Sequence, residues 1–118
     1  MLRRDSMMPI AILSLATLLV PLLFRTHIVL MVLILIPISA AMVWSGFSKV
    51  RLHVFLIGFV FGPLAEAICI AAGMWTYSEA LFIGLPAWLP FAWGNASLAI
   101  LSAETWLKKV MPPEISTR

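Results

Sequence analysis

Charged residues are scarce in this sequence of 118 residues, and cysteine is almost absent. Asp, Glu, Lys and Arg together make up 11% of the chain, whereas they make up about 25% of a typical soluble domain. Hydrophobic residues reach 63%, and the mean hydropathy is +1.08. A soluble domain of this length could not bury so many apolar side chains, so the composition predicts an integral membrane protein.

The single cysteine, Cys69, excludes a disulfide within the chain. It lies in an apolar run, where we expect a small buried side chain. The sequence also lacks a phosphate loop, a dinucleotide fingerprint and a nucleophile elbow, and no cluster of His, Cys, Asp and Glu has the spacing of a metal site. A net charge of +3 is too small to indicate a nucleic-acid partner. The sequence therefore predicts neither a bound metal nor nucleic-acid binding.

Four apolar stretches fill most of the chain, roughly residues 7–24, 26–47, 52–75 and 85–107. Each is close to the ~20 residues that a helix needs to cross about 30 Å of hydrocarbon, and only helices satisfy their own backbone groups in such a span. We expect the first stretch to be retained, because no cleavage site of small residues follows it. The breaks are short, so residues 1–118 are predicted to form one all-α membrane domain, a bundle of four transmembrane helices with antiparallel neighbours.

Basic residues are divided unequally between the two sides of this predicted bundle. One side holds both termini and the second connection, and the other side holds only Arg25. The basic residues of the first side are Arg3, Arg4, Lys49, Arg51, Lys108, Lys109 and Arg118. By the positive-inside rule, both termini are expected in the cytoplasm. The bacterial inner membrane is the expected location of a helical protein with this bias.

Each of the four predicted helices contains a proline: Pro21, Pro37, Pro63 or Pro90. Proline removes a backbone donor and bends a helix, and neighbouring helices in a membrane can satisfy the freed carbonyl. The prolines therefore indicate either ordinary membrane-helix usage or a set of bent helices around a cavity.

The third stretch carries one face of small residues with a carboxylate in it. At helical spacing the following positions lie within about 100° of one another: Gly58, Gly62, Ala65, Glu66, Cys69 and Gly73. Gly58 and Gly62 form a G-x-x-x-G pair, which lets another backbone approach closely. We therefore expect the face with Gly58, Gly62 and Gly73 to be buried against protein, and Glu66 to point toward a partner helix or a cavity.

Glu66 stands in an otherwise apolar run, where a charge costs several kcal/mol. No Lys or Arg lies at matching depth in the four spans, so we expect Glu66 to be neutral or paired with a cation from a ligand or another chain. A neutral Glu66 would donate a hydrogen bond, with Asn95 of the fourth stretch or a carbonyl freed by a proline as acceptor. Asn95 and Ser102 share one face of the fourth helix, whereas Ser97 and Glu104 lie about opposite. This helix is thus expected to have polar contacts on two sides.

The segment 66–93, EAICIAAGMWTYSEALFIGLPAWLPFAW, combines Glu66 with Trp75, Tyr77 and Trp93. It resembles a stretch in membrane proteins of carotenoid biosynthesis, of the carotenoid hydratase and lycopene cyclase kind. In that stretch a helix with an acidic residue leads to a Gly-x-aromatic-x-Tyr turn, and the next helix begins with prolines and a tryptophan. The resemblance implies that Glu66 protonates a polyene and that Trp75, Tyr77 and Trp93 stabilise a carbocation.

Three functions are compatible with the sequence. The first is an accessory or assembly subunit whose helix faces pack against membrane lipid and other membrane chains, in a larger complex or a homo-oligomer. The second, implied by the resemblance, is a protein that binds or acts on a lipid, a carotenoid or another isoprenoid. The third is a small proton-coupled transporter, because the length and single membrane glutamate are similar to those of the small multidrug resistance family. That family carries its glutamate in the first helix, where this chain has none.

Overall fold

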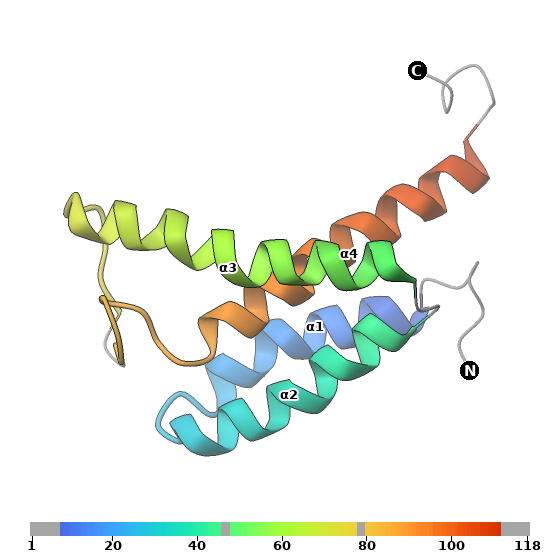
Figure 1. Cartoon of the computed structure of the whole chain (residues 1–118). Coiled ribbons are helices and arrows are strands. Elements are labelled where there is room, and N and C mark those ends of the chain that lie inside the picture. Colours follow the sequence, from blue (N-terminus) through green and yellow to red (C-terminus); the bar gives the residue numbers. More distant parts are fainter. Residues whose placement is uncertain (1–7, 46–47, 78–79, 112–118) are drawn as a thin grey trace.

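The computed structural model describes residues 8–45, 48–77 and 80–111, and the described chain is all-helical (Figure 1). Its helices are α1 (Met8–Leu23), α2 (Ile28–Trp44), α3 (Lys49–Ala71) and α4 (Leu89–Val110). The connection between α3 and α4 contains one isolated bridge between Phe82 and Leu85. The prediction of an all-α chain with four helices is therefore confirmed.

Within the described residues, α3 is the one helix that is both long and apolar enough to cross a membrane. The helices α1 and α2 are apolar but have 16 and 17 residues, and this corresponds to about 24 and 26 Å. The helix α4 has 22 residues, but Glu104, Lys108 and Lys109 lie in its last two turns. The structure thus supports one candidate span, and the bundle of four spans stays a prediction.

The third helix ends four residues earlier than predicted, at Ala71, because a local motif closes it. Gly73 has a φ of +82°, and its N–H donates to the carbonyl of Ile70 at 2.9 Å. The N–H of Met74 donates to the carbonyl of Cys69 at 3.0 Å. This pair of bonds around a glycine with positive φ is the Schellman motif, which satisfies the last carbonyls of a helix. Gly73 therefore terminates α3 and does not extend its packing face.

The fourth helix begins four residues later than predicted, at Leu89, and Pro90 lies in its first turn. Proline is tolerated there because the first N–H groups of a helix have no partner within the helix. Of the two alternatives for the prolines, a set of bent helices around a cavity therefore receives no support from Pro90. Pro21, Pro37 and Pro63 do lie inside α1, α2 and α3.

The helix α4 is the central element of the fold. It packs against each of the other three helices, whereas the backbones of α1 and α3 do not lie side by side in the described chain. Figure 1 shows α3 on one side of α4 and the α1–α2 pair on the other. The distance between α3 and the α1–α2 pair increases toward the end of α3 that leads into its connection with α4. Much of the surface of each helix consequently has no neighbouring helix within the described residues.

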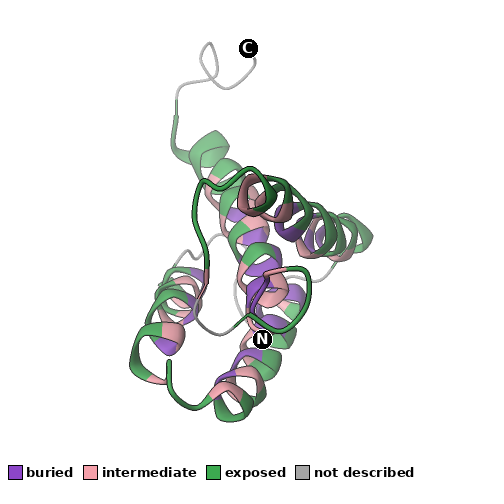
Figure 2. Cartoon of the chain, turned by 90° about the vertical axis from the view of Figure 1, so that its left-hand side faces the viewer, coloured by how far each residue is buried: buried purple, intermediate pink, exposed green. Residues whose placement is uncertain are grey.

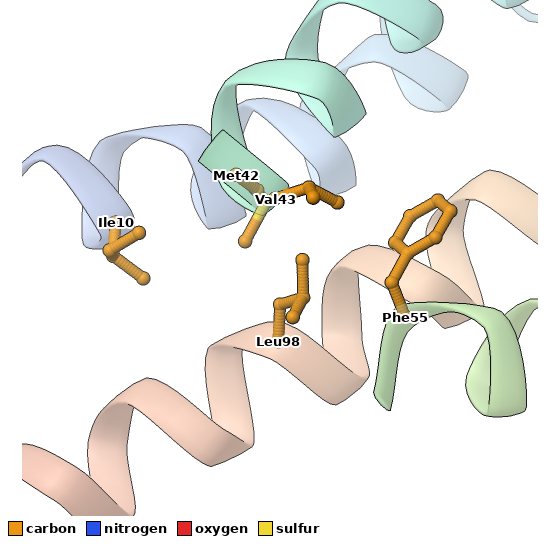
Figure 3. Packing of buried hydrophobic residues seen from close by; sticks show 5 residues of the cluster. All are labelled: Ile10, Met42, Val43, Phe55 and Leu98. Carbon is orange, nitrogen blue, oxygen red and sulfur yellow. The ribbon is translucent and has the colours of Figure 1, made fainter. Parts of the chain in front are cut away.

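Two small apolar clusters hold these helices together. One is made by Ile10, Met42, Val43, Phe55 and Leu98, one or two side chains from each helix, which converge in Figure 3. The other is made by Val20, Met31 and Leu35 of the α1–α2 pair. Figure 2 shows that the outward surfaces of the helices are largely exposed, and these surfaces carry most of the large apolar side chains.

Arg51 links three helices by hydrogen bonds at the end of the molecule where α3 begins. Its side chain is only 9% exposed. Nη1 donates to Oγ of Ser102 in α4 at 2.9 Å, and Nη2 donates to the carbonyl of Met42 in α2. That carbonyl belongs to the last turn of α2, where a cation is favoured by the helix dipole. Arg51 is thus a structural residue as well as one of the basic residues counted for topology.

Replacement of Arg51 by Ala should lower the free energy of unfolding by about 2 kcal/mol, because two charge-assisted hydrogen bonds are lost. The measurement is unfolding in mixed micelles by titration with dodecyl sulfate. Lys49→Ala, an exposed basic residue two positions earlier, is the matched control and should stay within about 0.5 kcal/mol of wild type. Equal stabilities of the two variants would show that the Arg51 contacts contribute nothing.

Candidate functional site

Glu66 lies in the last part of α3, five residues before Ala71. At 1.5 Å per residue, this places it about 7.5 Å from the end of the helix. The predicted span reached residue 75 and would have put Glu66 deeper. Because α3 ends at Ala71, Glu66 is instead within reach of the connection that follows it.

Two neutral donors hold the carboxylate of Glu66. The hydroxyl of Tyr77, in the connection between α3 and α4, donates to Oε1. The indole Nε1 of Trp93, in the second turn of α4, donates to Oε2 at 2.6 Å. Hydrogen bonds to a carboxylate are shorter and stronger than those between neutral groups. Glu66 therefore ties its own helix to both the connection and the next helix.

Further aromatic side chains surround Tyr77. Its ring meets the ring of Trp88 edge to face, with centroids 6.0 Å apart. Burial raises the pKa of Tyr77 to about 12, and the neighbouring Glu66 adds to this shift, whereas a hydrogen bond with Trp75 opposes it. Tyr77 consequently keeps its proton at neutral pH and remains a hydrogen-bond donor to Glu66.

Small residues on α3 set the position of Trp93. A Cβ added at Gly62 would overlap the ring of Trp93, and one added at Gly58 would overlap Ser97 and lie 2.8 Å from the carbonyl oxygen of Trp93. On the opposite helix, a Cβ at Gly94 would overlap the ring of Phe55. The structure thus buries Gly58 and Gly62 against α4, and this close approach brings the Trp93 indole to Glu66.

Asn95 and Gly73 do not join this arrangement. Asn95 is 1% exposed, and its Nδ2 donates to Oγ1 of Thr17 in α1 at 3.0 Å. Its Oδ1 has no partner among the described residues, so the expected hydrogen bond from Glu66 to Asn95 is not formed. Gly73 is exposed, and a Cβ there would meet nothing within 4 Å. The expectation that Gly73 lies on the buried face is therefore wrong, because the helix has already ended.

The predicted residues thus separate into three groups. Glu66, Tyr77 and Trp93 are in direct contact, and Trp75 joins them through Tyr77. Gly58 and Gly62 of α3 pack against Trp93 and its neighbour Ser97. Asn95 belongs to the interface with α1, and Gly73 lies outside both contacts. Sequence reasoning missed Trp88, whose ring meets Tyr77 and also packs against the cluster of Val20, Met31 and Leu35. Trp88 immediately precedes α4, so helical spacing gave no signal for this contact.

The chemistry available at this site is that of one carboxylate among aromatic rings. Among the described residues, no three His, Cys, Asp or Glu side chains are close enough to hold a metal ion. Cys69 is a free thiol and is half-buried. The site can accept hydrogen bonds, hold or release a proton at Glu66, or face a positive charge.

Comparisons with protein-family models, curated proteins and solved structures found no match to this chain. The similarity to proteins of carotenoid biosynthesis therefore rests on the residues of segment 66–93 alone.

Gly62→Leu should displace the Trp93 ring and weaken the packing of α3 on α4, with a loss of about 2 kcal/mol or more in the free energy of unfolding. The emission spectrum of the tryptophans should shift as Trp93 leaves Glu66. Ala65→Leu is the matched control, since Ala65 is exposed on the same helix. If both variants keep wild-type stability and emission, the glycine contact does not position Trp93.

Proposed function

We propose that the protein is a small polytopic membrane protein with both termini in the cytoplasm, acting as an accessory or assembly subunit of a larger membrane complex. The observation that carries this proposal is the apolar outer surface of the helices. Examples are Leu18 and Leu22 of α1, Val29 of α2, and Phe61 and Ile68 of α3, which are 63–74% exposed. Surfaces of this kind are stable against lipid or against other apolar helices.

The short lengths of α1 and α2 favour protein neighbours in addition to lipid. Helices of about 25 Å are shorter than the hydrocarbon core, and such mismatch is relieved by thinning of the bilayer or by association with other helices. Within the described chain, α1 and α2 pack against each other and against α4, and α2 also meets α3 at the Arg51 contact, whereas their outer faces are exposed. A larger assembly would cover this pair and complete the fold.

The contacts of Glu66 support a packing role in this proposal. Both carboxylate oxygens accept hydrogen bonds from the same chain. These bonds fix the connection and the start of α4 on α3, so the site does not depend on an external group for its hydrogen bonds.

The proposed topology predicts the side on which each connection can be labelled. In a Cys69→Ala background, a cysteine added after Arg118 should react with a membrane-impermeant maleimide only after the cells are lysed. Thr26→Cys, in the exposed turn between α1 and α2, should react in intact cells. Labelling of the added C-terminal cysteine in intact cells would overturn the topology.

A second candidate function is supported by the contact between Glu66, Tyr77 and Trp93. These are the residues to which the resemblance assigns an acid and two aromatic stabilisers, and they come together although Glu66 and Trp93 are 27 positions apart. In this alternative the protein binds a lipid, a carotenoid or another isoprenoid from the membrane, and Glu66 supplies a proton.

Purification of wild type and Glu66→Gln in a mild detergent separates these two functions. The amide retains the shape of the side chain but cannot release a proton. A subunit should copurify with larger membrane proteins in both forms. An enzyme acting on an isoprenoid should instead be isolated with a coloured or lipid ligand, and Glu66→Gln should keep the fold but lose turnover. A chain that is isolated alone, without partner or ligand, would contradict both proposals.

A further inference from the structure

The Glu66 site includes two exposed tryptophans, of which Trp93 is in direct contact with the carboxylate. Trp93 is 37% exposed and Trp75 is 41% exposed, and Glu66 itself is half-buried. The polar Nε1 of Trp93 donates to Glu66, and Trp75 lies beside Tyr77. Apart from the indole N–H groups, the exposed surface of these two side chains is the apolar surface of their rings.

No positive charge of the described chain offsets a charge on Glu66. The donors Tyr77 and Trp93 are neutral, so they stabilise a carboxylate without cancelling its charge. At this end of the molecule, Arg25 is the only Arg or Lys among the described residues. Arg25 lies in the exposed turn between α1 and α2, and within the described chain no ion pair joins it to Glu66. The site thus offers a carboxylate that has hydrogen-bond donors but no counterion among the described residues.

An apolar path leads away from the site along α4. Ala96 and Ile100 follow Trp93 at three and seven positions, so they share one face of the helix. Both are exposed, and Ile100 is 72% exposed. A molecule with a charged head at Glu66 would therefore have an apolar surface for a hydrocarbon tail.

We propose that Glu66, Trp75 and Trp93 form a binding site for an amphipathic ammonium ion, a primary or quaternary amine on a hydrocarbon tail. The carboxylate pairs with the positive nitrogen, and the indole faces attract the same charge through their quadrupoles. The tail lies along Ala96 and Ile100. This proposal depends on the Glu66 site alone, so it can fail or succeed independently of the proposed subunit function.

Two sources could supply this chemistry, the amine headgroup of a membrane lipid and a free amphipathic cation. Both place a nitrogen cation near the end of α3, close to where the helix meets its connection. The carboxylate and rings recognise the ammonium group in either case, and the composition of the membrane in the experiment distinguishes the sources.

The test uses the full chain in nanodiscs of a neutral galactolipid that lacks an amine, with dodecyltrimethylammonium as the probe. Tryptophan fluorescence should change in a saturable manner as the probe is added. Glu66→Gln should weaken binding by about tenfold, since the charge is removed but the hydrogen-bonding shape is kept. Trp93→Leu should weaken binding several-fold, whereas Trp93→Phe, which keeps an aromatic face, should bind more tightly than Trp93→Leu.

Glu104→Gln is the matched control, because Glu104 is an exposed carboxylate paired with Lys108 at the opposite end of α4. Its affinity for the probe should equal that of wild type, and circular dichroism should show native helicity in every variant. Added phosphatidylethanolamine that competes with the probe would identify a lipid headgroup as the source, whereas an unchanged affinity would identify a free cation. Non-saturable partitioning of the probe into wild type, or equal affinity of wild type and Glu66→Gln, would overturn the proposal.

Discussion

The close approach of α3 to α4 is the contact on which the other features of this structure depend. Gly58 and Gly62 on α3 and Gly94 on α4 leave no room for a Cβ, so side chains and backbone of the opposite helix fill that space. In apolar surroundings such contacts stabilise helix pairs through van der Waals packing. This approach makes α4 the shared partner of all other helices and places the Trp93 indole beside Glu66.

Polar side chains connect the helices at three positions along their length. Glu66 links α3 to its connection and to α4, Asn95 links α4 to α1, and Arg51 links α3 to α2 and α4. These bonds join different helices or a helix and its connection, and a buried polar group without a partner is costly. Among the described residues, Oδ1 of Asn95 and Oγ of Ser39 have no partner, and neither has Nε1 of Trp88, whose ring meets Tyr77. Both oxygens of Glu66 itself accept hydrogen bonds.

The proposed function rests on the contrast between a small interior and a large apolar exterior. Few side chains are buried, and the outer faces of the helices are apolar, which supports a membrane protein that associates with lipid or other chains. The polar site at the end of α3 is different, because it combines a carboxylate with exposed indole rings. Binding of an isoprenoid or an amine at this site is compatible with a role as a subunit.

The sequence by itself determined the four apolar helices and the small-residue face of Gly58 and Gly62, because helical periodicity assigns each residue to a face. It also grouped Glu66 with Tyr77 and Trp93, through the resemblance of one segment. Only the tertiary structure decided which groups meet. A pattern of residues does not give the rotation of one helix against another. The sequence therefore could not show that Asn95 donates to Thr17 of α1, or that Glu66 accepts from Tyr77 and Trp93. Nor does a hydrophobic run locate the end of a helix, which at α3 is set by the backbone hydrogen bonds around one glycine.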